Sequence, residues 1–143
     1  MTGRPEGPSG PLDTATLELL AQRASTHPRV VEWSFRPDAL SPRVLELRLD
    51  DSQYPSSVGS ARLDIRWFDG GDYSVHYLEL DGEKTWQCRW DRHPKPGAPL
   101  EHFHAPPDAT TVEPSPLEGA HHLDVLFWVL AWIDERVQEL FEE

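Results

Sequence analysis

The sequence predicts a single α+β domain in which two helices pack on one face of a five-stranded antiparallel sheet. Five segments alternate apolar and polar residues with a period of two, a helical segment precedes them, and a longer one follows. The connections between the alternating segments are short and rich in Pro, Ser, Gly and Asp, as in an antiparallel meander. A chain of 143 residues is long enough to bury one core.

The N-terminal part is predicted to contain a flexible leader and a short helix. Residues 1–11 hold three Gly and three Pro with little to bury, so the folded domain is expected over residues 12–143. Asp13 or Thr14 can cap the first helix, which should end before the His27-Pro28 pair. Its apolar face repeats at helical spacing, with Leu17, Leu20, Ala21 and Ala24.

The five strands follow from alternation, and their register follows from the turns. Asp81-Gly82 predicts a tight hairpin turn between the last two strands, with Leu80 opposite Glu83. This register places His76 opposite Gln87, Ser74 opposite Arg89, Tyr77 opposite Trp86, Val75 opposite Cys88 and Tyr73 opposite Trp90. A three-residue loop over residues 69–71 should pair Trp67 with Tyr73. The alternating residues of the first three strands are Val31, Trp33 and Phe35, then Leu45, Leu47 and Leu49, then Leu63, Ile65 and Trp67.

The C-terminal part should contain a proline-broken loop and a long helix. Prolines between Asp91 and Pro114 exclude regular helix there and leave at most a short extended piece from Glu101 to His104. Ser115, Pro116 and Glu118 resemble the cap and first turn of a helix running to about Leu140.

This last helix is apolar nearly all round, so more than one of its sides must be covered. The sheet can cover one side, and the first helix or a second subunit must cover the other. A homodimer through this helix, at Trp128 and Trp132, is therefore an expectation. The apolar run from Leu123 to Ile133 is too short to span a bilayer, so no membrane helix is expected.

The net charge of the chain limits the kinds of ligand that it can bind. The chain has 25 Asp and Glu against 13 Lys and Arg, which gives a formal net charge of -12. Such a chain repels a nucleic-acid backbone at long range, so a phosphate ligand would need a local cluster of Arg and His. Cys88 is the single cysteine, which excludes a disulfide framework and a cysteine zinc site. No signal peptide is visible, so a soluble cytoplasmic protein is expected.

The polar face of the predicted sheet gathers residues suited to phosphate chemistry. The predicted register places Arg66, Ser74 and Arg89 in one row across the strands. Asp64, His76 and Gln87 form the next row. His102 and His104 point the same way in an extended backbone, and His93 lies just past the preceding strand. His27, His121 and His122 are assigned to the surface or to helix capping.

Three functions are compatible with these residues. In a metal-independent ribonuclease, His76 and one of His102 or His104 would act as base and acid, Arg66 and Arg89 would bind phosphate, and Asp64 or Asp91 would orient an imidazole. In a metal-dependent hydrolase, His93, His102 and His104 with Asp91 would hold a divalent metal. In a non-catalytic interaction module, the aromatic face and the loop would bind a partner protein. We favour the ribonuclease, with no metal and no cofactor, and with Gln87 and Ser74 also contacting substrate.

The block from Asp72 to Ala109 resembles a known family. Its DYSVHYLE, CRWDRHP and HFHAPPDA segments are similar to those of the TumE-type toxins of prokaryotic type II toxin-antitoxin modules, and the acidic composition suggests a haloarchaeal-like member. The resemblance implies a small cytoplasmic toxin with a cognate antitoxin, commonly a helix-turn-helix protein, and nucleic acid or translation as the target. Carried over by position, its functional residues are His76, Arg89, Asp91, His93, His102 and His104.

The acidic, Lys-poor composition predicts a halophilic protein whose stability rises with salt. Of the 13 basic residues only Lys84 and Lys95 are Lys. Repulsion among the acidic groups should fade when the Debye length falls from about 10 Å near 0.1 M salt to about 3 Å near 1 M. Urea unfolding at these two salt concentrations should therefore give a higher free energy of unfolding in the more concentrated salt. A free energy of unfolding that is the same at both salt concentrations would count against a halophilic protein.

Overall fold

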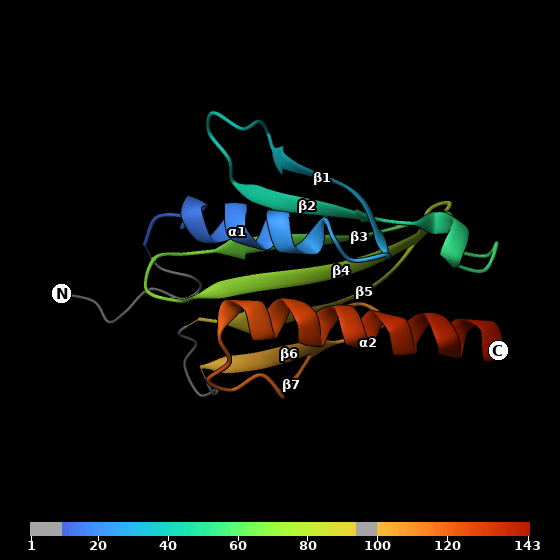
Figure 1. The fold of residues 1–143 in the computed structure, drawn as a ribbon. Coiled ribbons are helices and arrows are strands. Elements are labelled where there is room, and N and C mark those ends of the chain that lie inside the picture. Colours follow the sequence, from blue (N-terminus) through green and yellow to red (C-terminus); the bar gives the residue numbers. More distant parts are fainter. Residues whose placement is uncertain (1–9, 94–99) are drawn as a thin grey trace.

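The computed structural model describes residues 10–93 and 100–143, and it contains one antiparallel sheet with two α-helices on one of its faces (Figure 1). The helices are α1 (Thr14–Ala24) and α2 (His122–Glu142), and a 3-10 helix, η1 (Asp51–Gln53), follows the second strand. The strands are β1 (Val30–Arg36), β2 (Val44–Leu49), β3 (Ser60–Trp67), β4 (Tyr73–Asp81), β5 (Lys84–Arg92), β6 (Glu101–Ala105) and β7 (Thr111–Pro114).

The sheet has seven strands in the order β1-β2-β3-β4-β5-β6-β7, so the prediction of five strands is wrong. The α+β class, the meander and the positions of the first five strands are confirmed. The two added strands lie in the segment predicted as loop, where the prolines end β6 and β7 without preventing a short hairpin. The predicted leader at residues 1–9 and the prolines Pro94, Pro96 and Pro99 lie outside the described residues.

The register between β3 and β4 is confirmed, whereas that between β4 and β5 is shifted by two residues. Trp67 pairs with Tyr73, as the three-residue loop predicts. In the β4-β5 hairpin, however, Asp81 pairs with Lys84, so the turn residues are Gly82 and Glu83. Gly82 has a φ of 59°, whereas the φ of Glu83 is not positive. One glycine at the first central position suits a type II′ turn, whereas the predicted type I′ turn needs positive φ at both positions.

Both helices were located by sequence, and their boundaries are confirmed except for the start of α2. Asp13 caps α1 by accepting a hydrogen bond from the Thr16 N–H at 3.1 Å. The predicted start of the last helix at Ser115 is wrong, because α2 begins at His122 with His121 as its cap. Gly119, with a φ of 73°, adopts a left-handed conformation that interrupts any helix running from Ser115.

The core fills the space between the sheet and the two helices. Figure 1 shows α1 over the strands from the first half of the sheet and α2 over those of the second half. Leucine and isoleucine side chains of β2 and β3 pack against α1, and larger aromatic side chains of β4 and β5 lie on the same face. The largest fully buried side chains are Trp90, Tyr73, Tyr77, Leu17, Leu20, Leu45, Leu47, Leu49, Leu63, Ile65, Leu130 and Ile133.

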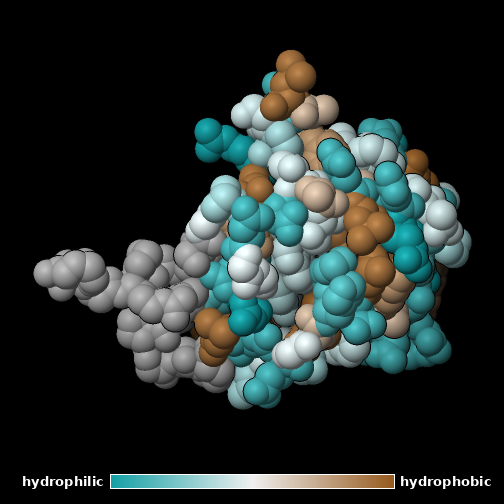
Figure 2. All heavy atoms as spheres, turned by 60° about the vertical axis from the view of Figure 1, so that its left-hand side comes forward, coloured by the Kyte–Doolittle hydropathy of each residue, from teal (hydrophilic) through white to brown (hydrophobic). Residues whose placement is uncertain are grey.

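Much of the second apolar side of α2 is covered within the chain. The Trp132 ring lies 5.0 Å from the ring of Trp90 and stacks on Trp86 at 6.3 Å, so it belongs to an internal aromatic cluster. Trp128 and Phe127 stay 37% and 39% exposed. Figure 2 shows hydrophobic side chains on one face in groups separated by hydrophilic ones. The homodimer stays a prediction. No α-helix in the described ranges is long and apolar enough to cross a membrane.

A buried polar network fixes α2 to the sheet. Glu79 on β4 accepts two hydrogen bonds from Arg136 on α2, each of 2.8 Å. Tyr77 donates to the same carboxylate at 2.6 Å, and the Tyr77 hydroxyl also lies 2.7 Å from that of Tyr54. Burial raises the pKa of the Tyr77 phenol well above its ordinary value, so this hydroxyl keeps its proton. The Arg136 guanidinium also lies 3.6 Å above the Trp86 ring.

Removing the cation from this network should destabilise the fold strongly. Arg136→Met leaves the Glu79 carboxylate, 4% exposed, without its charged partner, which should cost roughly 3–5 kcal/mol in the free energy of unfolding. The matched control is Asp134→Asn, which breaks an exposed pair with Arg29 and should cost less than about 1 kcal/mol. Urea unfolding measures both. If Arg136→Met cost no more than the control, the network would not be what holds α2.

Candidate functional site

The candidate site lies on the face of the sheet opposite the helices, in two adjacent rows of side chains. Strand pairing aligns the first row as Asp64, His76, Arg89 and His104, which we call the His76 row. It aligns the second as Arg66, Ser74, Asp91 and His102, which we call the Asp91 row. Each row crosses β3, β4, β5 and β6. The residues expected to act together are thus on one face.

The composition of the two predicted rows is wrong because of the shifted β4-β5 register. Arg89 lies opposite His76 instead of Ser74, and Asp91 takes the place next to Ser74. A shift of two residues leaves every side chain on its predicted face. Gln87 leaves the His76 row by pairing, yet its side chain still reaches His76.

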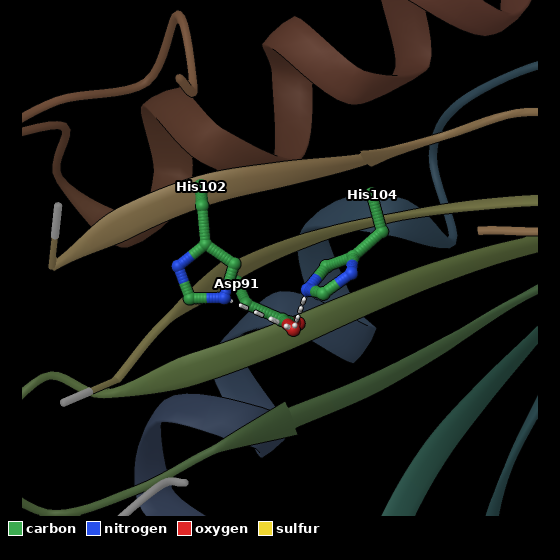
Figure 3. Close-up of side chains that lie close together, drawn as sticks. All are labelled: Asp91, His102 and His104. Carbon is green, nitrogen blue, oxygen red and sulfur yellow. Dashed lines mark ion pairs between the residues drawn. The ribbon is translucent and has the colours of Figure 1, made fainter. Parts of the chain in front are cut away.

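The centre of the site is the carboxylate of Asp91. Its Oδ2 atom lies 3.0 Å from Nε2 of His104, 3.5 Å from Nε2 of His93 and 3.8 Å from Nε2 of His102. Arg89 donates from Nε to the same oxygen at 2.8 Å. Figure 3 shows the two imidazoles of β6 pointing toward Asp91 on β5. Three imidazoles and a guanidinium therefore surround one carboxylate.

Local sequence explains why these side chains meet. Asp91 and His93 are two residues apart, as are His102 and His104, and side chains two apart in a strand share a face. Pairing of Asp91 with His102 then brings the two pairs together. Glu101 fixes the start of β6, since its carboxylate lies 3.3 Å from Arg92 Nε and accepts from the Gly119 N–H at 2.9 Å.

The side chains of the site differ in their exposure to solvent. Asp91, His102 and His104 are 2%, 0% and 6% exposed, whereas about a third of the Arg89 side chain is accessible. His102 therefore cannot touch a substrate in this conformation. Among the described residues, Asp91 Oδ1 is buried and accepts no hydrogen bond. A carboxylate oxygen in this condition is costly unless a cation or a donor compensates it.

Two contacts compete for Nε2 of His104. Arg89 lies 3.2 Å from this nitrogen through one of its terminal NH2 groups, and a guanidinium can only donate. The Asp91 oxygen at 3.0 Å can only accept from an ionised carboxylate. Nε2 must carry a lone pair to satisfy Arg89 and a proton to satisfy Asp91. The position is therefore suited to exchanging a proton or to binding a cation.

His76 has a different environment. Its Nε2 lies 2.8 Å from the Gln87 side-chain oxygen, which can only accept, so this nitrogen carries the proton and Nδ1 is free to accept one. Burial is the main cause that lowers the His76 pKa below its ordinary value, the Gln87 hydrogen bond opposes it, and the positive charge of Arg89 lowers it further. A neutral imidazole at pH 7 is the form that a general base needs.

The other expected residues have separate environments. Asp64 accepts from Arg62 Nε at 3.1 Å, and its predicted role in orienting an imidazole stays a prediction. Arg66 is exposed at the end of the Asp91 row, and Ser74 is half-buried beside Asp91. Sequence reasoning missed Arg62, although its place two residues before Asp64 on the same face was an available signal.

This arrangement has two chemical capacities. The His76 row places a cation between two imidazoles, which suits acid–base chemistry on a phosphate. Around Asp91, one ligand atom each from Asp91, His102 and His104 lie within 4.8 Å of one another, which suits a metal ion.

Comparison with known proteins gives one match. The model of the family described as Toxin TumE matches residues 16–137. This span covers most of the chain and includes every residue of the His76 row and of the Asp91 row. Neither the curated proteins nor the solved structures contain a match to this chain.

The environment of His76 predicts how it titrates. NMR of its ring nitrogens should show a midpoint below the ordinary value of 6.5, with the proton of the neutral form on Nε2. Arg89→Gln removes a neighbouring positive charge and should raise this midpoint. A midpoint at or above 6.5 in the parent protein would contradict the neutral state at pH 7.

Proposed function

Because the chain belongs to the TumE toxin family, we propose that it is the toxin of a toxin-antitoxin module and acts by cleaving RNA at the His76 row. Membership of a toxin family implies a cognate antitoxin. The observation that supports the cleavage proposal is the alignment of His76, Arg89 and His104 on three adjacent strands. No step of this reaction requires a metal.

The distances between strands suit a phosphate. Neighbouring strands lie about 4.8 Å apart, so the backbones of His76 and His104 are roughly 10 Å apart, with Arg89 between them. Two imidazoles pointing inward from such a separation can approach a phosphate from opposite sides. The guanidinium between them can bind its non-bridging oxygens and stabilise the charge that develops on them.

The reaction we propose is transesterification followed by release. His76 Nδ1 takes the proton of a ribose 2′-hydroxyl, and the 2′-oxygen attacks phosphorus. The bond from phosphorus to the 5′-oxygen breaks, and His104 gives a proton to that oxygen. The products are a 2′,3′-cyclic phosphate and a 5′-hydroxyl end. Asp91, 3.0 Å from His104, orients its ring.

The remaining predicted residues have narrower roles in this proposal. Arg66 is exposed on the same face and can contact a neighbouring phosphate of the RNA, and Ser74 lies between it and Asp91. Gln87 acts through His76 by fixing its tautomer. His102 is 0% exposed and His104 is 6% exposed, so His104 is the more accessible of the two and is the proposed acid. Because the chain carries a net charge of -12, these few cations must supply the attraction to RNA locally.

The expected cellular setting is the cytoplasm, where RNA and an antitoxin are both present. We expect a helix-turn-helix antitoxin, as the family resemblance implies. The homodimer through α2, predicted at Trp128 and Trp132, is an independent proposal. Trp128 and Phe127 are exposed, whereas Trp132 packs against Trp86 and Trp90. Neither the antitoxin nor a dimer contributes a residue to the proposed reaction.

Growth and cleavage assays test the function together. Expression of the parent chain should arrest bacterial growth, and co-expression of the antitoxin encoded beside it should relieve the arrest. His76→Ala and His104→Gln should each abolish the arrest, because loss of an acid or base typically costs about 10²–10⁴-fold in rate. His121→Asn is the matched control, since it removes a histidine outside the site and keeps a capping side chain on α2.

Purified protein should cut a mixed-sequence RNA and leave 2′,3′-cyclic phosphate ends. An otherwise identical oligonucleotide with 2′-deoxyribose should stay intact, because it lacks the attacking hydroxyl. Thermal melts establish that each variant is folded. Full activity of His76→Ala, or cleavage of the deoxy substrate, would show that the acid–base assignment is wrong.

A further inference from the structure

The cluster around Asp91 contains more ligand groups than the proposed reaction uses. Acid–base cleavage needs His104 and an orienting carboxylate, yet His93 and the inaccessible His102 also point at Asp91. We propose that Asp91, His93, His102 and His104 form a binding site for a divalent transition metal of the zinc type. The site is distinct from the phosphate position beside Arg89 and His76.

The distances from Asp91 to the three imidazoles are close to those of a tetrahedral site. With zinc–nitrogen and zinc–oxygen bonds of about 2.0–2.1 Å, neighbouring ligand atoms lie about 3.3 Å apart. The Asp91 oxygen lies 3.0, 3.5 and 3.8 Å from the three Nε2 atoms, which brackets that value. Ligand atoms of Asp91, His102 and His104 all lie within 4.8 Å of one another, so shifts of roughly 1 Å would bring these three onto an ion. His93, 3.5 Å from Asp91, lies outside this group and would have to turn toward the ion.

The electrostatics also call for a cation. The Asp91 side chain is 2% exposed, and within the described residues its Oδ1 atom accepts no hydrogen bond. The His104 Nε2 atom faces both this carboxylate and Arg89. A dication bound to Oδ2 and to the imidazole nitrogens would compensate the buried charge of the carboxylate. Arg89, which donates to Oδ2 at 2.8 Å, would hold the carboxylate in place beside the ion.

The donor set selects the kind of metal. Three imidazoles and one carboxylate suit Zn²⁺, Co²⁺, Ni²⁺ or Cu²⁺, whereas Mg²⁺ and Ca²⁺ prefer oxygen donors. With His93 as the fourth ligand no coordination position would stay open, which is typical of structural or regulatory zinc rather than catalytic zinc. The predicted ion is therefore not the catalyst of RNA cleavage.

The metal site and the proposed acid–base reaction share His104. If the proposed function holds, metal binding should therefore affect RNA cleavage. A metal on His104 Nε2 would displace the contact from Arg89 and fix the ring on the ion, away from the leaving oxygen. Loading with Zn²⁺ should therefore reduce RNA cleavage, and a chelator should restore it.

Metal binding is measured first, without RNA. Chelator-treated protein is titrated with Zn²⁺ by calorimetry and with Co²⁺ by visible absorption. We expect one ion per chain and the intense Co²⁺ bands of a tetrahedral site. His102→Ala should abolish binding, and His93→Ala, at the more exposed edge, should weaken it at least tenfold and lower the band intensity. His121→Asn should leave binding unchanged, which would show that the neighbouring pair of His121 and His122 is not the metal site.

The outcomes separate this inference from the proposed function. Binding that is absent, or that survives both His93→Ala and His102→Ala in folded protein, would overturn the metal site. Tetrahedral Co²⁺ in protein that cuts no RNA would support the site while the proposed function fails. Cleavage that requires Zn²⁺ would support the site but overturn its closed, inhibitory character together with the metal-free mechanism.

Discussion

A carboxylate buried among imidazoles is the constraint on which the polar half of this molecule depends. Removing the charge of Asp91 from water is expensive unless partners replace the lost hydration. Among the described residues of this part of the chain, β5 offers Arg89 and the residue after its end, His93, as partners. The pairing with β6 adds His102 and His104, and this requirement explains why a segment broken by prolines still joins the sheet.

The opposite face of the same strands supplies the rigidity that the site needs. Trp90 precedes Asp91 and points into the core, where it meets Trp132 of α2 at 5.0 Å. A second buried carboxylate, Glu79, is compensated by Arg136 from α2. Successive residues of β4 and β5 therefore point alternately into the helix-covered core and into the site. Catalytic and metal-binding groups on such rigid strands hold their geometry better than groups on loops.

Sequence patterns predicted the face of every site residue but not their partners. Alternation placed His76 and Arg89 on one face of the sheet and made His102 and His104 point the same way as each other, because side-chain direction in a strand depends only on parity. The partners depend on the turn, and one glycine at Gly82 moved the register by two residues. The strands β6 and β7 were missed because proline arguments exclude helix but not a short edge hairpin. Burial of His102 could not be read from sequence, since Asp91 and His93, which lie beside its ring, precede β6 in the chain and meet it only through strand pairing.

The metal site and the acid–base row both depend on direct coupling between Asp91 and His104. A double-mutant cycle measures that coupling through the free energy of unfolding of chelator-treated protein, using Asp91→Asn, His104→Gln and the double variant. Residues in one charged network couple by about 0.5–3 kcal/mol, so we predict a coupling energy above about 1 kcal/mol. A value below about 0.3 kcal/mol would contradict the account, because the two side chains would then act independently.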